Sequence, residues 1–137
     1  MTTAREIMSD DVRCVQENQT LQEAAQMMKD MGVGALPVCG EDDRLKGMVT
    51  DRDIVVECVA SGGDPSSTTA GQLADGKPVT IGADDSVEEA LSTMAEHQVR
   101  RLPVIDGHRL VGIVSQADVA RALPEDQVGR VVEAISI

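Results

Sequence analysis

Residues 47–54 read Gly-Met-Val-Thr-Asp-Arg-Asp-Ile, and residues 112–119 read Gly-Ile-Val-Ser-Gln-Ala-Asp-Val. In each copy a glycine precedes two apolar residues, a hydroxyl residue follows, and an aspartate stands three positions after the hydroxyl. This pattern predicts a strand that ends where a helix begins, with Thr50 or Ser115 at or next to the N-cap in a variant of the capping box. A helix start also presents unpaired N–H groups that favour an anion. The same residues therefore fit either a plain helix start or half of a nucleotide site.

The two copies belong to a longer internal repeat. A shift of 66 positions aligns segments between residues 4 and 38 with segments between residues 70 and 104. One residue is then lost in a polar turn, and a shift of 65 aligns the two copies quoted above. A match of this length with a single gap indicates a tandem duplication.

Each repeat predicts the order strand, helix, strand, strand, helix. The first helix of each repeat starts at a Thr/Ser-x-x-Glu capping box, at Thr20 or Ser86. Gly32 and Gly34 fit the end of this helix in the first repeat, and His97-Gln98 ends it in the second without a glycine. Because a helix joins the first two strands, these strands should be parallel and adjacent. The expected strands are Val12–Val15, Val79–Ile81, the Leu-Pro-Val segments 36–38 and 102–104, Leu45–Val49 and Leu110–Val114, and the final helices reach Ala60 and Leu123.

The prolines and the predicted domain boundaries complete this description of the repeats. The proline of each Leu-Pro-Val segment suggests an edge strand or a strand end. The predicted domains are residues 1–62 for the first repeat with its N-terminal segment, 63–69 for a flexible linker, 70–123 for the second repeat, and 124–137 for a C-terminal helix or tail. The apolar spacing of this last helix fits a cover over the core or a surface for a partner.

The composition limits the classes of partner. The 137 residues include no Phe, Trp or Tyr, so aliphatic side chains and seven Met must fill the core and grip any planar ligand. The formal net charge of −12 argues against nucleic acid and anionic membrane as partners. A small anion near Arg52, Arg100 or Arg101 remains compatible with it. The first residues lead into no apolar segment and no stretch approaches a membrane span, so we expect a cytoplasmic protein, with leaderless export left open.

The cysteines and histidines form no recognisable metal set. Cys14, Cys39 and Cys58 lack CxxC spacing, and His97 and His108 do not complete a ligand group. The simplest interpretation of each cysteine is a small buried apolar residue. Cys14 and Cys39 fall on neighbouring predicted strands, which leaves a disulfide between them open, although a cytosol would keep it reduced.

The Leu-Pro-Val segments, each followed by Gly-φ-φ-(Thr/Ser)-x-x-Asp (φ, apolar), resemble a pair of CBS domains, the Bateman module, over residues 4–123. The run His-Gln-Val-Arg-Arg-Leu-Pro-Val at residues 97–104 is especially typical of that family. Among CBS proteins the chain resembles the stand-alone actinobacterial type of the hypoxic response. The resemblance implies an α/β (α+β) fold in which two repeats pack as a pseudo-twofold pair with two clefts, and a homodimer.

The resemblance also implies a site in each cleft. Asp53 and Asp118 would hold the ribose hydroxyls of an adenosine compound, with Thr50 and Ser115 near ribose or phosphate. A carboxylate can accept both hydroxyls of a vicinal diol through charge-assisted hydrogen bonds. Residues implied near the base are Val33, Gly34, Ala35, Val99, Arg100 and Arg101, and those implied to line the walls are Cys14, Val15, Thr80 and Ile81.

The aspartates and arginines of these sites also have a simpler interpretation. Asp53 and Asp118 fit as capping residues, and Arg100 and Arg101 fit as salt-bridge partners of Glu96 or of the acidic surface. The candidate ligands are AMP, ADP, ATP and S-adenosylmethionine, with no obligatory cofactor and no metal. At a net charge of −12 the polyphosphate of ATP would need neighbouring arginines or a metal, so AMP or a less charged adenosine compound is easier to accommodate.

The sequence argues against an enzyme. It contains no evident nucleophile–base pair, metal constellation or GxxxxGK loop. Two non-enzymatic functions remain: a sensor of an adenosine-type ligand, and an orphan, ligand-free CBS dimer that acts as an interaction protein in the response to hypoxia or stress. Both require a separate effector protein, which the sequence does not identify.

Overall fold

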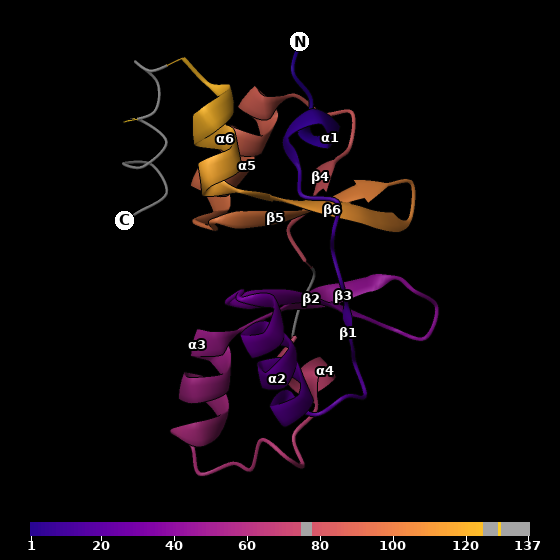
Figure 1. The fold of residues 1–137 in the computed structure, drawn as a ribbon, viewed down its shortest axis with the longest axis vertical. Helices are drawn as coiled ribbons and strands as arrows, with labels where there is room; N and C mark the ends of the chain where they lie inside the picture. The colour runs from indigo at the N-terminus through magenta and orange to yellow at the C-terminus, as the bar shows by residue number, and fades with distance from the viewer. Residues whose placement is uncertain (75–77, 125–128, 130–137) are drawn as a thin grey trace. The chain divides into compact units, whose positions relative to one another are not determined.

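The computed structural model describes residues 1–74, 78–124 and 129, and these form two compact units (Figure 1). The first-repeat unit comprises the described residues of Arg13–Pro78. The second-repeat unit comprises Met1–Val12 and the described residues from Val79 onward. Each unit contains one three-stranded sheet with helices on one of its faces, so the predicted fold of two β-α-β-β-α repeats is confirmed.

The first-repeat unit has the strand order β1-β2-β3. Strand β1 is parallel to β2, as predicted for strands joined by a helix, and β2 and β3 form an antiparallel hairpin. The helix after β3 continues as a π-helix, in which the Ala60 N–H donates to the Val55 carbonyl at 2.8 Å. The elements are β1 (Val15–Gln16), α2 (Leu21–Met31), β2 (Ala35–Cys39), β3 (Leu45–Thr50), α3 (Asp51–Asp53), the π-helix η1 (Ile54–Val59) and α4 (Ala70–Leu73).

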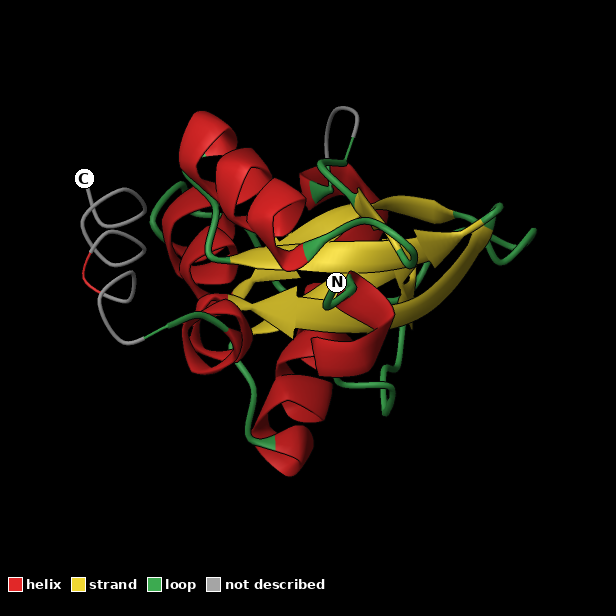
Figure 2. Cartoon of the chain, turned by 90° about the horizontal axis from the view of Figure 1, so that it is seen from above, coloured by secondary structure: helices red, strands yellow, loops and turns green. Residues whose placement is uncertain are grey.

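The second-repeat unit repeats this topology with the strand order β4-β5-β6. Figure 2 distinguishes its helices from its strands by colour. In both units the core is aliphatic, and Leu21, Leu36, Met94 and Leu102 are among the largest fully buried side chains. The elements are α1 (Ala4–Ile7), β4 (Ile81–Gly82), α5 (Val87–His97), β5 (Arg101–Asp106), β6 (Arg109–Ser115) and α6 (Gln116–Ala122).

Helices α2 and α5 begin and end where the sequence places them. The Thr20 hydroxyl accepts from the Glu23 N–H at 3.1 Å, and the Ser86 hydroxyl accepts from the Glu89 N–H at the same distance. Gly32 ends α2 with φ of 68°, in the left-handed region that glycine adopts without steric cost. Gln98 ends α5 in the same conformation, with φ of 55°, which is uncommon for a residue with a Cβ.

The prolines do not mark an edge or a strand end, so that prediction was wrong. Pro37 and Pro103 stand inside the middle strand of each sheet. The Asp51 N–H donates to the Gly34 carbonyl at 3.0 Å, and because an antiparallel pair uses the N–H of alternate residues, the nitrogen of Pro37 points away from β3. On that side β1 pairs only with Val38 and Cys39. The proline therefore removes no ladder hydrogen bond.

The compact units differ from the sequence repeats in their leading segments. Residues 1–12 open the first repeat in the sequence but join the second-repeat unit. The Ser9 N–H donates to the Ile113 carbonyl at 2.9 Å, and the Ile113 N–H donates back to Ser9 at 3.0 Å. The Arg5 guanidinium donates to Asp106 at 2.9 Å, which raises its pKa above the ordinary value. Helix α4, which opens the second sequence repeat, packs in the first-repeat unit in the same way.

The predicted linker, residues 63–69, carries its own hydrogen bonds. The Asp64 carboxylate accepts from the Ser66 hydroxyl at 2.7 Å and from the Ser66 N–H at 2.9 Å, and these bonds hold the pKa of Asp64 below its usual range. The Leu21 N–H donates to the Thr68 carbonyl at 2.8 Å, so the segment is tied to the start of α2. The predicted C-terminal helix or tail, residues 124–137, lies outside the described residues except for Pro124 and Gly129.

The contact between Ser9 and β6 leads to a prediction about Gly112. A Cβ at this position would lie 2.8 Å from the backbone oxygen of Ser9, which cannot rotate away. We expect Gly112→Ala to lower the free energy of unfolding by about 1–3 kcal/mol. Urea unfolding followed by far-UV circular dichroism measures this, because the chain has no Trp, Tyr or Phe to report by fluorescence.

Gly34→Ala is the matched control for this change. Its Cβ would meet only the Asp51 carboxylate, at 3.1 Å, and that exposed side chain can move. We expect a change within about 0.5 kcal/mol. Equal effects of the two substitutions would show that the packing of residues 1–12 on β6 contributes nothing particular to stability.

Candidate functional site

The two aspartates of the repeated stretch lie in closely similar capping boxes. The Thr50 hydroxyl accepts from the Asp53 N–H at 3.0 Å, and Asp53 Oδ2 accepts from the Thr50 N–H at 3.1 Å. The Ser115 hydroxyl accepts from the Asp118 N–H at 3.2 Å, and Asp118 Oδ2 accepts from the Ser115 N–H at 2.8 Å. The capping interpretation therefore holds at both positions. Each box uses only one carboxylate oxygen.

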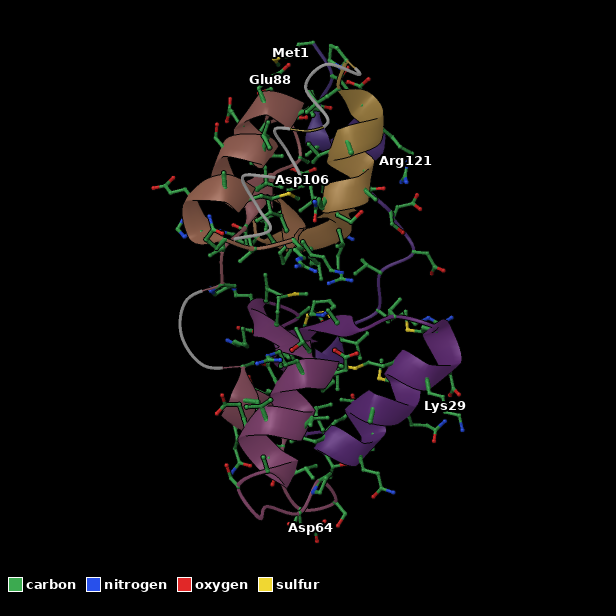
Figure 3. The ribbon with its side chains drawn as sticks, turned by 90° about the vertical axis from the view of Figure 1, so that its left-hand side faces the viewer. Met1, Lys29, Asp64, Glu88, Asp106 and Arg121 are labelled. Carbon is green, nitrogen blue, oxygen red and sulfur yellow. A yellow bond between two sulfur atoms is a disulfide. The ribbon has the colours of Figure 1, made fainter. Side chains whose placement is uncertain are left out.

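The second carboxylate oxygen distinguishes the two boxes. Asp118 Oδ1 is paired with Nη2 of Arg121, one helical turn further along α6. The equivalent of Arg121 in the first repeat is Val56, and Asp53 Oδ1 has no hydrogen-bond partner within the described part of the chain. The side chain of Asp118 is 16% exposed and that of Arg121 is 71% exposed. Figure 3 shows Arg121 on the outer side of α6.

A small hollow of about 190 Å³ borders this pair in the second-repeat unit. It is lined by Ile7, Asp118, Arg121 and Ala122. Ile7 belongs to α1, so the N-terminal segment supplies an apolar wall beside the predicted ribose carboxylate. Sequence reasoning missed Ile7 and Arg121. The spacing of Asp118 and Arg121, three residues apart on one helix, was the available signal for the arginine.

The first-repeat unit has a larger and more open groove, of about 460 Å³, between α2 and η1. It brings together the predicted residues Val33 and Gly34 but not Thr50, Asp53 or Ala35. Its full lining is Ala25, Met28, Lys29, Gly32, Val33, Gly34, Asp51, Ile54 and Val55.

The remaining predicted site residues lie in varied environments. Val15, Ala35 and Ile81 are buried, and Thr80 and Val99 are half-buried. Arg100 and Arg101 are exposed, and neither forms a salt bridge with Glu96 or with any other residue in the described ranges. Both arginines therefore remain available to an anion.

Cys14 and Cys39 are joined by a disulfide, with their Cα atoms 5.7 Å apart. The parallel register that pairs Val15 with Val38 and Gln16 with Cys39 places Cys14 beside the end of β2. Cys58 is buried and free. Within residues 1–74 and 78–124, no group of three or more His, Cys, Asp or Glu side chains could hold a metal ion. None of the helices described is long and apolar enough to cross a membrane.

The repeated fold and boxes match a known family. CBS domains match residues 4–59 and 70–125, and the chain therefore belongs to the CBS domain family, as a tandem pair. It is 56% identical to hypoxic response protein 1 of Mycobacterium tuberculosis over 135 residues, which are 98% of this chain and 94% of that relative. The resemblance to the hypoxic response type is thereby confirmed.

Two solved structures show the same arrangement of elements. Hypoxic Response Protein I with two coordinated zinc ions has a TM-score of 0.84 at 57% identity, over 90% of this chain and all of that one. The zinc ions are a feature of that structure, and the described residues of this chain include no group of three or more His, Cys, Asp or Glu side chains that could hold one. The CBS domain pair of protein MJ0100, in complex with 5′-methylthioadenosine and S-adenosyl-L-methionine, has a TM-score of 0.78 at 25% identity, over 89% of this chain and 95% of that one.

The disulfide should stabilise the first-repeat unit measurably. It closes a loop with a sequence separation of 25, and restricting the unfolded chain in this way contributes roughly 3 kcal/mol. We expect dithiothreitol to lower the urea midpoint of the native protein but not that of the Cys14→Ser/Cys39→Ser variant, which keeps Cys58. Mass spectrometry after alkylation of the unreduced, denatured protein gives the second readout. Alkylation of all three thiols would contradict the bond.

Proposed function

We propose that this chain is a non-enzymatic regulatory CBS-pair protein that senses an adenosine-type ligand: AMP, ADP, ATP or S-adenosylmethionine. The observation that carries the proposal is the duplicated capping box. In each copy the box leaves a second carboxylate oxygen, on Asp53 or Asp118, that can accept a hydroxyl. A ribose offers two such hydroxyls, and charge-assisted hydrogen bonds to a carboxylate are about twice as strong as neutral ones.

The class of ligand is supported by a relative and by the charge of the chain. The CBS pair of MJ0100 is described with two adenosine compounds, neither of which carries a phosphate. At a net charge of −12 a polyphosphate would be repelled unless cations stood beside it. Arg100 and Arg101 are exposed and form no salt bridge with described residues, and two cations offset the charge of a monophosphate more fully than that of a polyphosphate.

Sensing requires that the ligand favour one conformation of the protein over another. A ligand that binds two states equally shifts nothing, whatever its affinity. The ligand would therefore change the relative arrangement of the repeats or the association of two chains, and a separate effector protein would read the change. We place the protein in the cytoplasm, and the Cys14–Cys39 disulfide is the feature that argues against this location, because reducing pools keep most cytosolic thiols free.

A second function is favoured by the similarity to hypoxic response protein 1. In it the CBS pair binds no small ligand and acts as an interaction protein in the response to hypoxia or stress. In that case the boxes at Asp53 and Asp118 only cap helices, and the charges beside them serve solubility.

Isothermal titration calorimetry separates the two functions. We expect saturable heat from AMP, ADP, ATP or S-adenosylmethionine, lost in the Asp53→Asn/Asp118→Asn variant. The amide oxygen of Asn can still accept from the cap N–H, so the unliganded variant should keep its unfolding free energy within about 1 kcal/mol. Absence of heat with all four ligands from the folded native protein would leave the orphan function as the better one. Undiminished heat in the variant would exclude the ribose role.

We also propose that the chain forms a homodimer through the exposed valines of the first repeat. Val55, Val56 and Val59 on η1 are 58%, 42% and 53% exposed, and Val33 beside the groove is 41% exposed. The equivalent positions of the η1 valines in the second repeat are Ala120, Arg121 and Pro124, so this apolar face occurs once per chain.

A second copy is the partner that this face fits. Two chains of net charge −12 repel each other except where the contact is uncharged, and the valine face supplies such a contact. The groove beside it is lined by one cation, Lys29, and one anion, Asp51. In a twofold contact the same patch meets itself, so Lys29 can approach Asp51 of a second copy.

Sedimentation velocity tests the dimer. We expect the native protein to sediment as a dimer and Val55→Asp/Val59→Asp as a monomer, because two buried carboxylates without partners would destabilise the contact. Ser92→Asp, on the exposed face of α5, adds a charge elsewhere and should remain dimeric. A native monomer, or a dimer that survives the valine substitutions, would refute this interface.

A further inference from the structure

The two boxes differ in charge at the point where a ligand would meet them. Asp118 is accompanied by Arg121, whose guanidinium occupies Oδ1. Asp53 is accompanied by Val56 at the equivalent position. The duplicated sequence thus offers the same carboxylate twice, once with a cation beside it and once without.

Arg52 does not replace Arg121 in the first repeat. It immediately precedes Asp53, and neighbouring residues on a helix do not face each other, whereas residues three apart do. Accordingly Arg52 forms no salt bridge with Asp53 or with another described residue, and it is its backbone N–H that donates to Asp51 Oδ1, at 2.8 Å. Asp51 and Asp53 together leave the start of the first-repeat helix with an excess of one negative charge.

Arg121 has the properties of a movable anion ligand. Its side chain is 71% exposed and its partner is a single carboxylate oxygen, so little packing holds it in place. Exposed ion pairs of this kind contribute little to stability, and their partners exchange readily. The hollow bordered by Arg121 and Asp118 has an apolar wall from Ile7 and Ala122, and among the described residues no other charged side chain lines it.

We propose that Arg121 makes the Asp118 site selective for adenosine compounds that carry a phosphate next to the ribose, and that the Asp53 site prefers uncharged or cationic ones. This inference rests on the proposed function, because it assumes that Asp118 binds ribose. An incoming phosphate draws the guanidinium away from Asp118 Oδ1, and the freed oxygen accepts a ribose hydroxyl. The exchange replaces the one charge-assisted hydrogen bond between Arg121 and Asp118 with two, from Arg121 to the phosphate and from the ribose hydroxyl to Asp118.

A nucleoside without a phosphate offers Arg121 no new partner in place of Asp118. It must break the Asp118–Arg121 pair without a substitute, or bind with one carboxylate oxygen still occupied. At Asp53 the order reverses. No cation stands three residues further along the helix, and Lys29 is the one cation among the described residues of the groove that Asp51 lines. The carboxylates of Asp51 and Asp53 therefore repel a phosphate but not a neutral or sulfonium compound. The chain therefore has two unequal sites for two charge classes of one ligand family.

Calorimetric titration of AMP and adenosine into the Asp53→Asn variant tests the Asp118 site alone. Adding Arg121→Gln to that variant should lower the affinity for AMP by about tenfold, which corresponds to the loss of one charge-assisted hydrogen bond. The affinity for adenosine should stay the same or rise by no more than about fivefold, since an exposed pair no longer competes for Oδ1. Arg121→Lys keeps the charge and should retain most of the preference for AMP.

The converse change tests the Asp53 site. In the Asp118→Asn variant, Val56→Arg places a cation three residues after Asp53 and should raise the affinity for AMP relative to adenosine. Higher salt should reduce the preference for AMP wherever an arginine is present, because an exposed contact with phosphate is screened. Circular dichroism confirms that each variant is folded before titration.

The outcomes separate this inference from the function on which it rests. If the native protein binds neither AMP nor adenosine, the proposed sensing function fails and the inference falls with it. If both ligands bind but Arg121→Gln leaves the ratio of their affinities unchanged, the sensing function stands and the role of Arg121 is refuted. A selective loss of affinity for AMP in Arg121→Gln supports both the sensing function and the role of Arg121.

Discussion

The hydrogen-bonded box between a hydroxyl residue and an aspartate three positions later fixes the junction of strand and helix in both repeats. Thr50 and Ser115 each end a strand, and their side chains accept from the first turn of the helix that follows. The aspartate bonds back to the backbone of the hydroxyl residue, so its carboxylate cannot rotate freely. One local interaction thus ends β3 and β6, starts α3 and α6, and presents a carboxylate oxygen beyond the strand. The candidate site depends on this constraint.

Local patterns were sufficient to predict most of the fold. Capping boxes at Thr20 and Ser86, the glycine after α2 and the apolar periodicity act within a few residues, so a sequence records them directly. The exchange of leading segments could not be predicted, because hydrogen bonds between Ser9 and Ile113 join residues about a hundred positions apart. The prediction that the prolines mark an edge strand or a strand end was wrong for a related reason. Whether a proline needs an N–H depends on the length of the neighbouring strand, and β1 pairs with only two residues.

The sequence predicted the two capping boxes around which the candidate site is built, but not the charges beside them. The spacing of hydroxyl and aspartate located both carboxylates. It could not tell that Asp118 pairs with Arg121 while Asp53 Oδ1 is left without a partner in the described chain, because an arginine on a helix can reach several neighbours. The same limit applies to Arg100 and Arg101: a salt bridge with Glu96 was one of two interpretations left open, and none is formed within the described ranges. Side-chain pairing on a surface depends on competing solvent and partners.

The differences between the two repeats are more informative about function than their likeness. The hydrogen-bond distances in the boxes at Asp53 and Asp118 agree within a few tenths of an ångström. If the boxes served only to cap helices, the residues that follow them would not need to differ. Those residues diverge in kind: η1 exposes three valines, whereas α6 exposes an arginine over a carboxylate. Exposed valines favour contact with another apolar surface, and an exposed arginine favours an anion. This difference in surface chemistry at equivalent positions is what supports the two proposals above: self-association through the valines of the first repeat, and selection of a phosphate-bearing ligand by the arginine of the second.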